Sequence, residues 1–220
     1  MRQRTKVAMV AFLLFASLTY LFAFSPVFQV KTIYLSGTPQ GVSQTLILDK
    51  AQISVGDKLA RIEPRTVSTR LSSLNWISAI KLERNWFRGE IRLTITPRKA
   101  VGIYRGRALD KGGTLFDLPT GTPSDLPEVS ASNPQLGLLA IELFKELPGD
   151  LRNSLLSMYA NHESSIASVH QRGRGEIKIQ WGSSEDMALK VKVYRALLEL
   201  PENKDITMVD LSAPHAPIVK

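Results

Sequence analysis

Residues 75–104, with the sequence NWISAIKLERNWFRGEIRLTITPRKAVGIY, give the clearest structural signal in this chain. Apolar and polar side chains alternate on both sides of a turn that contains glycine, which is typical of a half-buried β-hairpin. Folding the two arms about this turn places Leu82 opposite Leu93. It also places Ile80 opposite Ile95, so both apolar rows lie on one face of the hairpin.

The sequence before the hairpin predicts one strand and two short helices. Alternating apolar residues from Phe28 to Leu35 predict the strand, and residues 42–53 form a weak helical pattern. A second helix begins at Pro64, because proline suits the first turn of a helix. Residues 27–100 are therefore expected to form a small β-α-α-β-β domain with one core.

Residues 101–213 are expected to form a second domain of mixed α+β structure with an antiparallel-rich sheet, so the fold class is α+β. Proline ends regular structure in the tail, residues 214–220. The predicted elements are, in order, a hairpin over 109–116, a proline-rich loop over 118–134, helices over 136–147 and 150–159, paired strands over 166–170 and 176–181, a helix over 184–200 that begins at Ser-Ser-Glu-Asp, and a last strand over 206–211.

The N-terminus predicts a single membrane anchor. Residues 7–24 carry no charge, and about 20 apolar residues span a bilayer as a helix, so the anchor is placed at residues 7–26. Three basic residues lie within residues 1–6, which keeps this segment in the cytoplasm and the remainder outside it. A cleavable signal peptide is the alternative, but Pro26 would follow the cleavage site and the apolar run exceeds the usual signal core.

The composition excludes several classes of function. The chain has 28 Lys and Arg against 20 Asp and Glu, and this scattered excess does not predict a nucleic-acid-binding protein. The absence of cysteine excludes disulfides, thiolate metal sites and a cysteine nucleophile.

No motif predicts catalysis, a metal or a cofactor. His162, His170 and His215 lack the spacing of metal ligands. Asp110 precedes Lys-Gly-Gly and is interpreted as a turn residue, and Ser183-Ser184 as a helix cap. Trp76, Trp86 and Trp181 fall in strand patterns, where packing is the usual role. The sequence therefore predicts a binding module rather than an enzyme.

Several short motifs together carry a resemblance to a known family. The motifs are FQVKTIYLSG at 28–37, the stretch from Asn75-Trp76-Ile77 to Val101, LDKGGTLF at 109–116, Leu126-Pro127 and Val209-Asp210-Leu211. The single anchor followed by these motifs resembles the FtsQ/DivIB family of bacterial cell-division proteins, which has a POTRA domain and a β-domain. Phe87, Pro97 and Ala100 depart from the family pattern near the junction of the two domains.

The resemblance implies a non-catalytic scaffold at the division septum, held in the bacterial plasma or inner membrane. Family members gather the small bitopic proteins FtsB and FtsL and link them to the septal enzymes of cell-wall synthesis. We therefore expect FtsB- and FtsL-like partners, and no nucleic acid, metal or cofactor.

The resemblance also places partner binding on the last strand of the β-domain. A strand at the edge of a sheet can take up an extended partner segment through main-chain hydrogen bonds. The alternative is an internal strand that completes the core. The expected partner-binding residues are Ile206, Thr207, Met208, Val209, Asp210, Leu211, Ser212 and Ala213.

Two other functions stay open from the sequence. One is a membrane-anchored chaperone or secretion component, since POTRA-like domains also receive unfolded chains. A series of POTRA domains or a following β-barrel would support this function, and the sequence predicts neither. An anchored wall hydrolase or ligand-binding protein is the other, and it would require clustered Asp, Glu, His or Ser.

Overall fold

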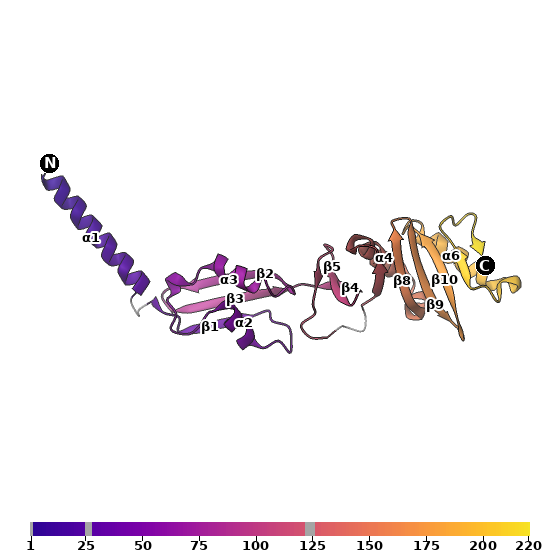
Figure 1. Ribbon diagram of the computed structural model, residues 1–220, viewed down its shortest axis with the longest axis horizontal. Coiled ribbons are helices and arrows are strands. Elements are labelled where there is room, and N and C mark those ends of the chain that lie inside the picture. The colour runs from indigo at the N-terminus through magenta and orange to yellow at the C-terminus, as the bar shows by residue number, and fades with distance from the viewer. Residues whose placement is uncertain (1, 25–27, 122–125) are drawn as a thin grey trace. The chain divides into compact units, whose positions relative to one another are not determined.

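A computed structural model describes residues 2–24, 28–121 and 126–220 (Figure 1). The chain forms two units that divide between Arg98 and Lys99.

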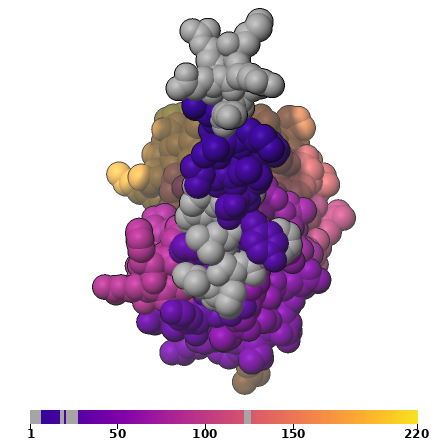
Figure 2. All heavy atoms as spheres, turned by 90° about the vertical axis from the view of Figure 1, so that its left-hand side faces the viewer, coloured from indigo at the N-terminus to yellow at the C-terminus, as the bar shows by residue number. Residues whose placement is uncertain are grey.

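Helix α1 (Arg2–Phe24) comes first, and its side chains from Val7 to Ala16 are exposed (Figure 2). Within the part of the chain that the structure describes, no helix reaches the length and mean hydropathy of a membrane span. The last residues of the predicted anchor, 25 and 26, lie outside the described residues.

The first unit has the predicted order of strand, helix, helix, strand, strand. Its sheet has the order β1-β3-β2, in which β1 and β3 are parallel and β2 and β3 are antiparallel. The elements after α1 are β1 (Thr32–Ser36), α2 (Gln44–Ala51), the 3-10 helix η2 (Leu59–Arg61), α3 (Pro64–Leu71), β2 (Ile77–Asn85) and β3 (Glu90–Pro97).

The hairpin has the predicted register. Leu82 pairs with Leu93 and Ile80 with Ile95, which confirms the expected fold of the two arms. On β3, Ile91, Leu93 and Ile95 are all buried, whereas the residues between them are not. One face of the sheet is thus covered and the other is open to solvent.

The two helices supply the covering layer. Ile47 and Ala51 of α2 are buried, as are Val67 and Leu71 of α3. Helix α3 begins at Pro64 as predicted, because the missing N–H of proline costs no hydrogen bond in a first turn.

The second unit contains a nine-stranded sheet with the order β12-β11-β10-β9-β8-β7-β4-β5-β6. Five neighbouring pairs are antiparallel and three are parallel. The elements are β4 (Ala100–Tyr104), β5 (Arg107–Asp110), β6 (Leu115–Phe116), β7 (Glu128–Ala131), α4 (Pro134–Glu146), α5 (Gly149–Ser154), β8 (Leu155–His162), β9 (Ser165–Arg172), β10 (Gly175–Gly182), α6 (Met187–Glu199), the 3-10 helix η3 (Pro201–Asn203), β11 (Met208–Asp210) and β12 (Ile218–Val219).

Two expected elements of this unit are wrong. The segment from 118 to 134 is not all loop, because it contains β7, whose Val129 is buried between β4 and β8. The helix expected over 150–159 ends at Ser154 and continues directly as β8. The four-residue spacing of Leu151, Leu155 and Tyr159 predicts a helix, but pairing of β8 with both β7 and β9 supplies its main-chain hydrogen bonds and overrides this preference.

The predicted start of α6 is also wrong. The helix begins at Met187, not at Ser184, and Asp186 precedes it with a positive φ of 52° and no capping side chain. The carbonyl of Ser183 instead accepts a hydrogen bond of 2.8 Å from Lys190 Nζ. The helical spacing of Met187, Val191, Tyr194 and Leu198 predicts one apolar face. This face is confirmed, since the first three are buried and Leu198 is half-buried. Their burial anchors α6 to the core of the unit.

A buried chain of hydrogen bonds fixes the centre of this core. Trp181 Nε1 donates to Ser168 Oγ (2.6 Å), which lies 2.7 Å from His170 Nε2. His170 Nδ1 lies 3.1 Å from the carbonyl oxygen of Leu151, which can only accept, so Nδ1 carries a proton and donates it to this oxygen. Burial lowers the pKa of His170, because water no longer solvates the charged ring.

The second unit should therefore lose stability in mild acid. The unfolded His170 titrates near its ordinary pKa of about 6.5, while the folded pKa is lower, so the unfolded state binds more protons below that pH. We expect the free energy of unfolding to be greatest above about pH 6.5 and to fall as the pH drops below it. Urea unfolding of the chain carrying Trp76→Phe and Trp86→Phe, followed by the fluorescence of the remaining Trp181, measures this.

His170→Gln should flatten this acid-side dependence, whereas His215→Gln, at an exposed position, should leave it unchanged. An unchanged pH dependence in His170→Gln would show that another group causes the acid sensitivity.

Candidate partner-binding edge

The predicted partner-binding strand lies near one end of the large sheet. Strand β11 pairs in parallel with β10, with Lys178 opposite Met208 and Ile179 opposite Val209. The N–H of Leu211 donates to Gln180 O (2.7 Å), which extends this pairing past the end of β11. The inner side of the predicted site is thus fixed by the sheet.

The outer side of β11 is covered, so the expectation of an unpaired edge is wrong. Strand β12 pairs with it antiparallel, with Val209 opposite Val219. The N–H of Lys220 donates to Met208 O (3.0 Å), and the N–H of Met208 donates to Lys220 O (3.1 Å). The tail over residues 214–220, which was expected to be irregular, therefore contains the edge strand. Without β12, the main-chain groups on the outer side of β11 would be unpaired.

The predicted residues divide between the core and the surface. Val209 and Leu211 are fully buried in the core of the second unit. Met208 and Asp210 alternate with them and are half-buried, and residues 212–213 are exposed. A partner on this edge can thus reach the main chain and alternate side chains, but not the buried pair.

Polar contacts hold both ends of β11. Before it, Arg172 donates to Ile206 O (3.2 Å) and to Asn203 O (3.4 Å). After it, Asp210 Oδ1 accepts from the N–H of Ser212 (2.9 Å) and from its Oγ (2.6 Å), which closes a turn. The edge is therefore set by side chains of β9 and of its own turn.

Gly182 allows that turn to approach β10. Its φ is +76°, and a Cβ on it would lie 2.9 Å from Ser212 Cβ and 3.0 Å from Ser212 Cα. Only glycine suits both the left-handed backbone and the close approach.

Sequence reasoning missed Ile218 and Val219 as a strand, although two β-branched residues together are a strand signal. The flanking prolines concealed this signal, and only the pairing with β11 reveals it.

The other residues considered from the sequence have structural roles. Asp110 Oδ1 accepts from the N–H of Gly112 and of Thr114, both at 2.8 Å, so it is the turn residue predicted. His162 is exposed and contacts Ser164. Across the described residues, no group of three His, Asp or Glu side chains is placed to hold a metal ion.

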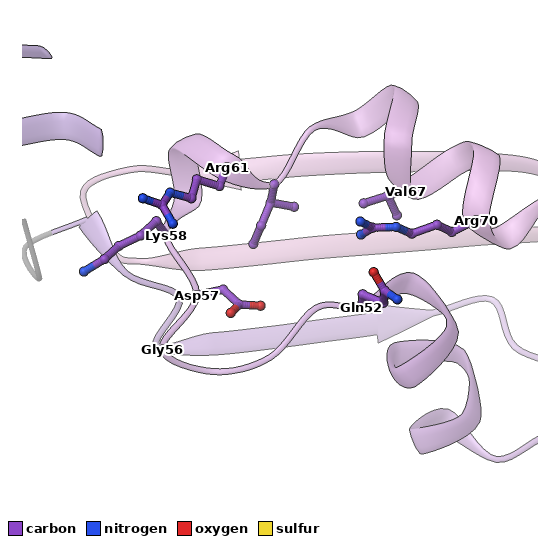
Figure 3. Close-up of a pocket in the computed structure, with 8 residues that line it drawn as sticks. Gln52, Gly56, Asp57, Lys58, Arg61, Val67 and Arg70 are labelled. Carbon is purple, nitrogen blue, oxygen red and sulfur yellow. The ribbon is translucent and has the colours of Figure 1, made fainter. Parts of the chain in front are cut away.

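The first unit contains a separate pocket of about 400 Å³ between the loop before η2 and α3. Figure 3 shows Arg70 and Asp57 extending toward one another across it, while Lys58 and Arg61 point away from Arg70. The N–H of Ser54 donates to Asp57 Oδ2 (2.7 Å), and Arg70 donates to Ala51 O (3.1 Å). The pocket is predominantly basic. Its lining residues are Gln52, Gly56, Asp57, Lys58, Arg61, Ile62, Val67 and Arg70.

Comparisons with known proteins agree with this architecture. Residues 28–98 match the POTRA domain of FtsQ type, and residues 101–212 match the C-terminal domain of the cell division protein FtsQ/DivIB. These two matches correspond to the two units of the structure. The fold is thus that of a POTRA protein with a second, sheet-rich α+β domain.

The chain belongs to the FtsQ/DivIB family. The cell division protein FtsQ of Streptomyces bingchenggensis is 29% identical over 94% of this chain and 82% of its own length. The FtsQ of Streptomyces venezuelae is 26% identical over 86% of this chain and 73% of its own length. The FtsQ of Streptomyces griseus is 29% identical over 77% of this chain and 86% of its own length.

Substituting Gly182 should displace the turn after β11. We expect Gly182→Ala to cost about 1–3 kcal/mol of stability, from left-handed backbone strain and from the clash with Ser212. Gly173→Ala is the matched control, since its φ is also positive but nothing lies within 4 Å of its Cβ. Urea unfolding of both variants gives the loss of stability in each, and hydrogen exchange over residues 207–213 shows whether the turn after β11 is displaced. The difference between the two losses is the cost of the clash with Ser212, because both variants share the backbone strain. Equal losses in the two variants would show that the contact with Ser212 is unimportant.

Proposed function

We propose that this chain is a non-catalytic scaffold of the bacterial division machinery. Its role is to bind FtsB- and FtsL-like bitopic partners and to link them to septal enzymes of cell-wall synthesis. The observation that carries the proposal is the match of both units, in order, to the two domains of FtsQ/DivIB proteins. The names of the three Streptomyces relatives support a role in cell division.

The proposed topology is a single pass through the plasma or inner membrane, with the N-terminus in the cytoplasm and both units outside. The sequence of residues 7–24 supports it, because eighteen consecutive residues carry no charge. The exposure of the apolar side chains from Val7 to Ala16 also supports it, since a helix that is apolar all round requires an apolar environment.

The proposed partner site is the outer side of β11, in residues 206–213. The partner gains access to this site by displacing β12. Strand β12 has only two residues, so few main-chain hydrogen bonds hold it in place. An extended partner segment can form the same bonds with β11 and continue beyond them. Because Val209 and Leu211 stay buried against β10 and the core, β11 remains as a template when β12 leaves.

A membrane-anchored POTRA chaperone is the second candidate function. The open polar face of the first sheet, with its two edge strands β1 and β2, favours it as a place for an extended chain. Binding of unfolded chains by the full protein, but not of an FtsB-like partner, would select this candidate.

Proline at Met208 tests the partner site. Its N–H points to β12 rather than to β10, so Met208→Pro removes an outer hydrogen bond and leaves the inner pairing intact. In the chain that lacks residues 214–220, where β12 cannot compete for the same hydrogen bond, we expect Met208→Pro to bind a purified FtsB-like partner about tenfold more weakly, as for the loss of one hydrogen bond. Met208→Ala is the control and should bind normally. Normal binding by a folded Met208→Pro variant would place the partner elsewhere.

Removal of residues 214–220 tests the displacement of β12. If the partner replaces β12, the truncated chain should bind about tenfold more tightly, since competition by a few weak hydrogen bonds is gone. Affinity is measured by calorimetry with the same FtsB-like partner. Weaker binding after truncation would show that the partner instead adds to the outer side of β12.

A further inference from the structure

The turn between β2 and β3 exposes a large aromatic side chain. Phe87 is 97% exposed, more than any other large apolar side chain among the described residues. A single exposed apolar residue is common and has no meaning by itself. Phe87 is of interest because its turn lies at the end of the first unit where β1 begins.

This turn packs against the first residues of the unit. The N–H groups of Lys31 and Thr32 both donate to Gly89 O, at 2.7 and 3.3 Å. A Cβ on Gly89 would lie 2.6 Å from Gln29 O, and Phe28 meets Trp86 edge to face at 6.3 Å. The hairpin turn is thus fixed at the end of the unit where β1 begins (Figure 1).

The loop before η2 lies at the same end. Gln29 forms a bridge with Lys58, and the N–H of Val30 donates to Asp57 O (2.8 Å). Figure 3 shows Lys58 and Arg61 extending away from Arg70. We call this end the N-terminal surface. Its residues are Phe28, Lys31, Lys58, Arg61, Trp86, Phe87 and Arg88.

The charge of the N-terminal surface is positive. Four of its seven residues are Lys or Arg, and two acidic residues, Asp57 and Glu90, lie beside them. Residues 28–98 as a whole carry eleven Lys and Arg against five Asp and Glu, whereas residues 99–220 carry fourteen against fifteen. The carboxylate of Asp57, which lies nearby, accepts a hydrogen bond from the N–H of Ser54 within its own loop. Aromatic rings beside Lys and Arg are the residues enriched where proteins meet lipid headgroups.

The chain keeps this surface close to α1. Four peptide units separate Phe24 from Phe28, and they reach about 14 Å at most when fully extended. If α1 spans the bilayer, Phe28 therefore lies within or just above the headgroup layer, which is about 5–8 Å thick on each side.

We propose that the N-terminal surface docks the first unit onto the bilayer that holds α1. Phe87 enters the interface between headgroups and acyl chains, and Lys31, Lys58, Arg61 and Arg88 contact the phosphates of anionic lipids. The inference rests on the membrane anchor of the proposed function and is independent of the partner site on β11. Docking fixes the orientation of the first unit at the membrane, leaving the second unit for partners.

Fluorescence quenching in bilayers tests the docking. The chain has no cysteine, so single cysteines can be labelled with a nitrobenzoxadiazole dye in the full protein. Liposomes of phosphatidylglycerol and phosphatidylcholine carry nitroxide quenchers either on the headgroup or within the acyl chain. The three labelled positions are Phe87→Cys, Ser78→Cys as an exposed control, and Leu14→Cys on α1. Ser78 lies about 23 Å along β2 from the end of the strand at which the turn begins.

We expect the headgroup quencher to quench the dye at position 87 but not at 78, and the acyl-chain quencher to quench it at position 14. Quenching at 14 without quenching at 87 overturns the docking and leaves the anchor intact. Equal quenching at 78 and 87 overturns it as well, because the unit then lies flat. No quenching at 14 refutes the anchor, and the docking with it.

Charge variants test the role of the headgroups. Arg88→Gln and Lys58→Gln should each lower the ratio of docked to undocked protein about fivefold in anionic bilayers, as measured by quenching at position 87. Arg65→Gln is the matched control, since Arg65 is exposed on α3 but does not belong to the surface. Equal effects of all three variants would show a general electrostatic attraction rather than docking by this surface.

Discussion

The strands of both sheets must pair their main-chain N–H and C=O groups, and this requirement governs where the neighbouring loops and turns lie. A buried N–H or C=O without a partner costs as much as a lost hydrogen bond, so each strand must find a neighbour or face solvent. In the first unit this requirement joins Val30 to Asp57 and Lys31 to Gly89, which draws a loop and a turn to one end. In the second unit it places β12 against β11. Both proposed binding surfaces result from these pairings.

The two units differ in net charge. The excess of basic residues beyond the N-terminal segment belongs entirely to the first unit, and the second is almost neutral. Electrostatic attraction thus suits the first unit to an anionic surface, while the second offers main-chain groups at the end of a sheet. A scaffold with these properties can hold its position by one unit and recruit partners by the other.

Particular elements show where sequence reasoning succeeded. The register of Leu82 with Leu93 followed from strict alternation around one turn, because a slip of one residue would expose the whole apolar row. The apolar face of α6 followed from its helical spacing. By contrast, β8 carries apolar residues at a helical spacing and still forms a strand, since its neighbours β7 and β9 decide its hydrogen bonding.

Local sequence patterns were enough to predict the order of elements in the first unit, the turn at Asp110, the strand pair β9–β10 and the family to which the chain belongs. Each of these features depends on a pattern that a single stretch of chain contains. The folded chain was needed to show that β11 is internal and that Ile218 and Val219 cover it. It also decided that Phe87 shares one end with Lys58, because contacts between residues distant in the chain arise from packing and pairing of the whole unit.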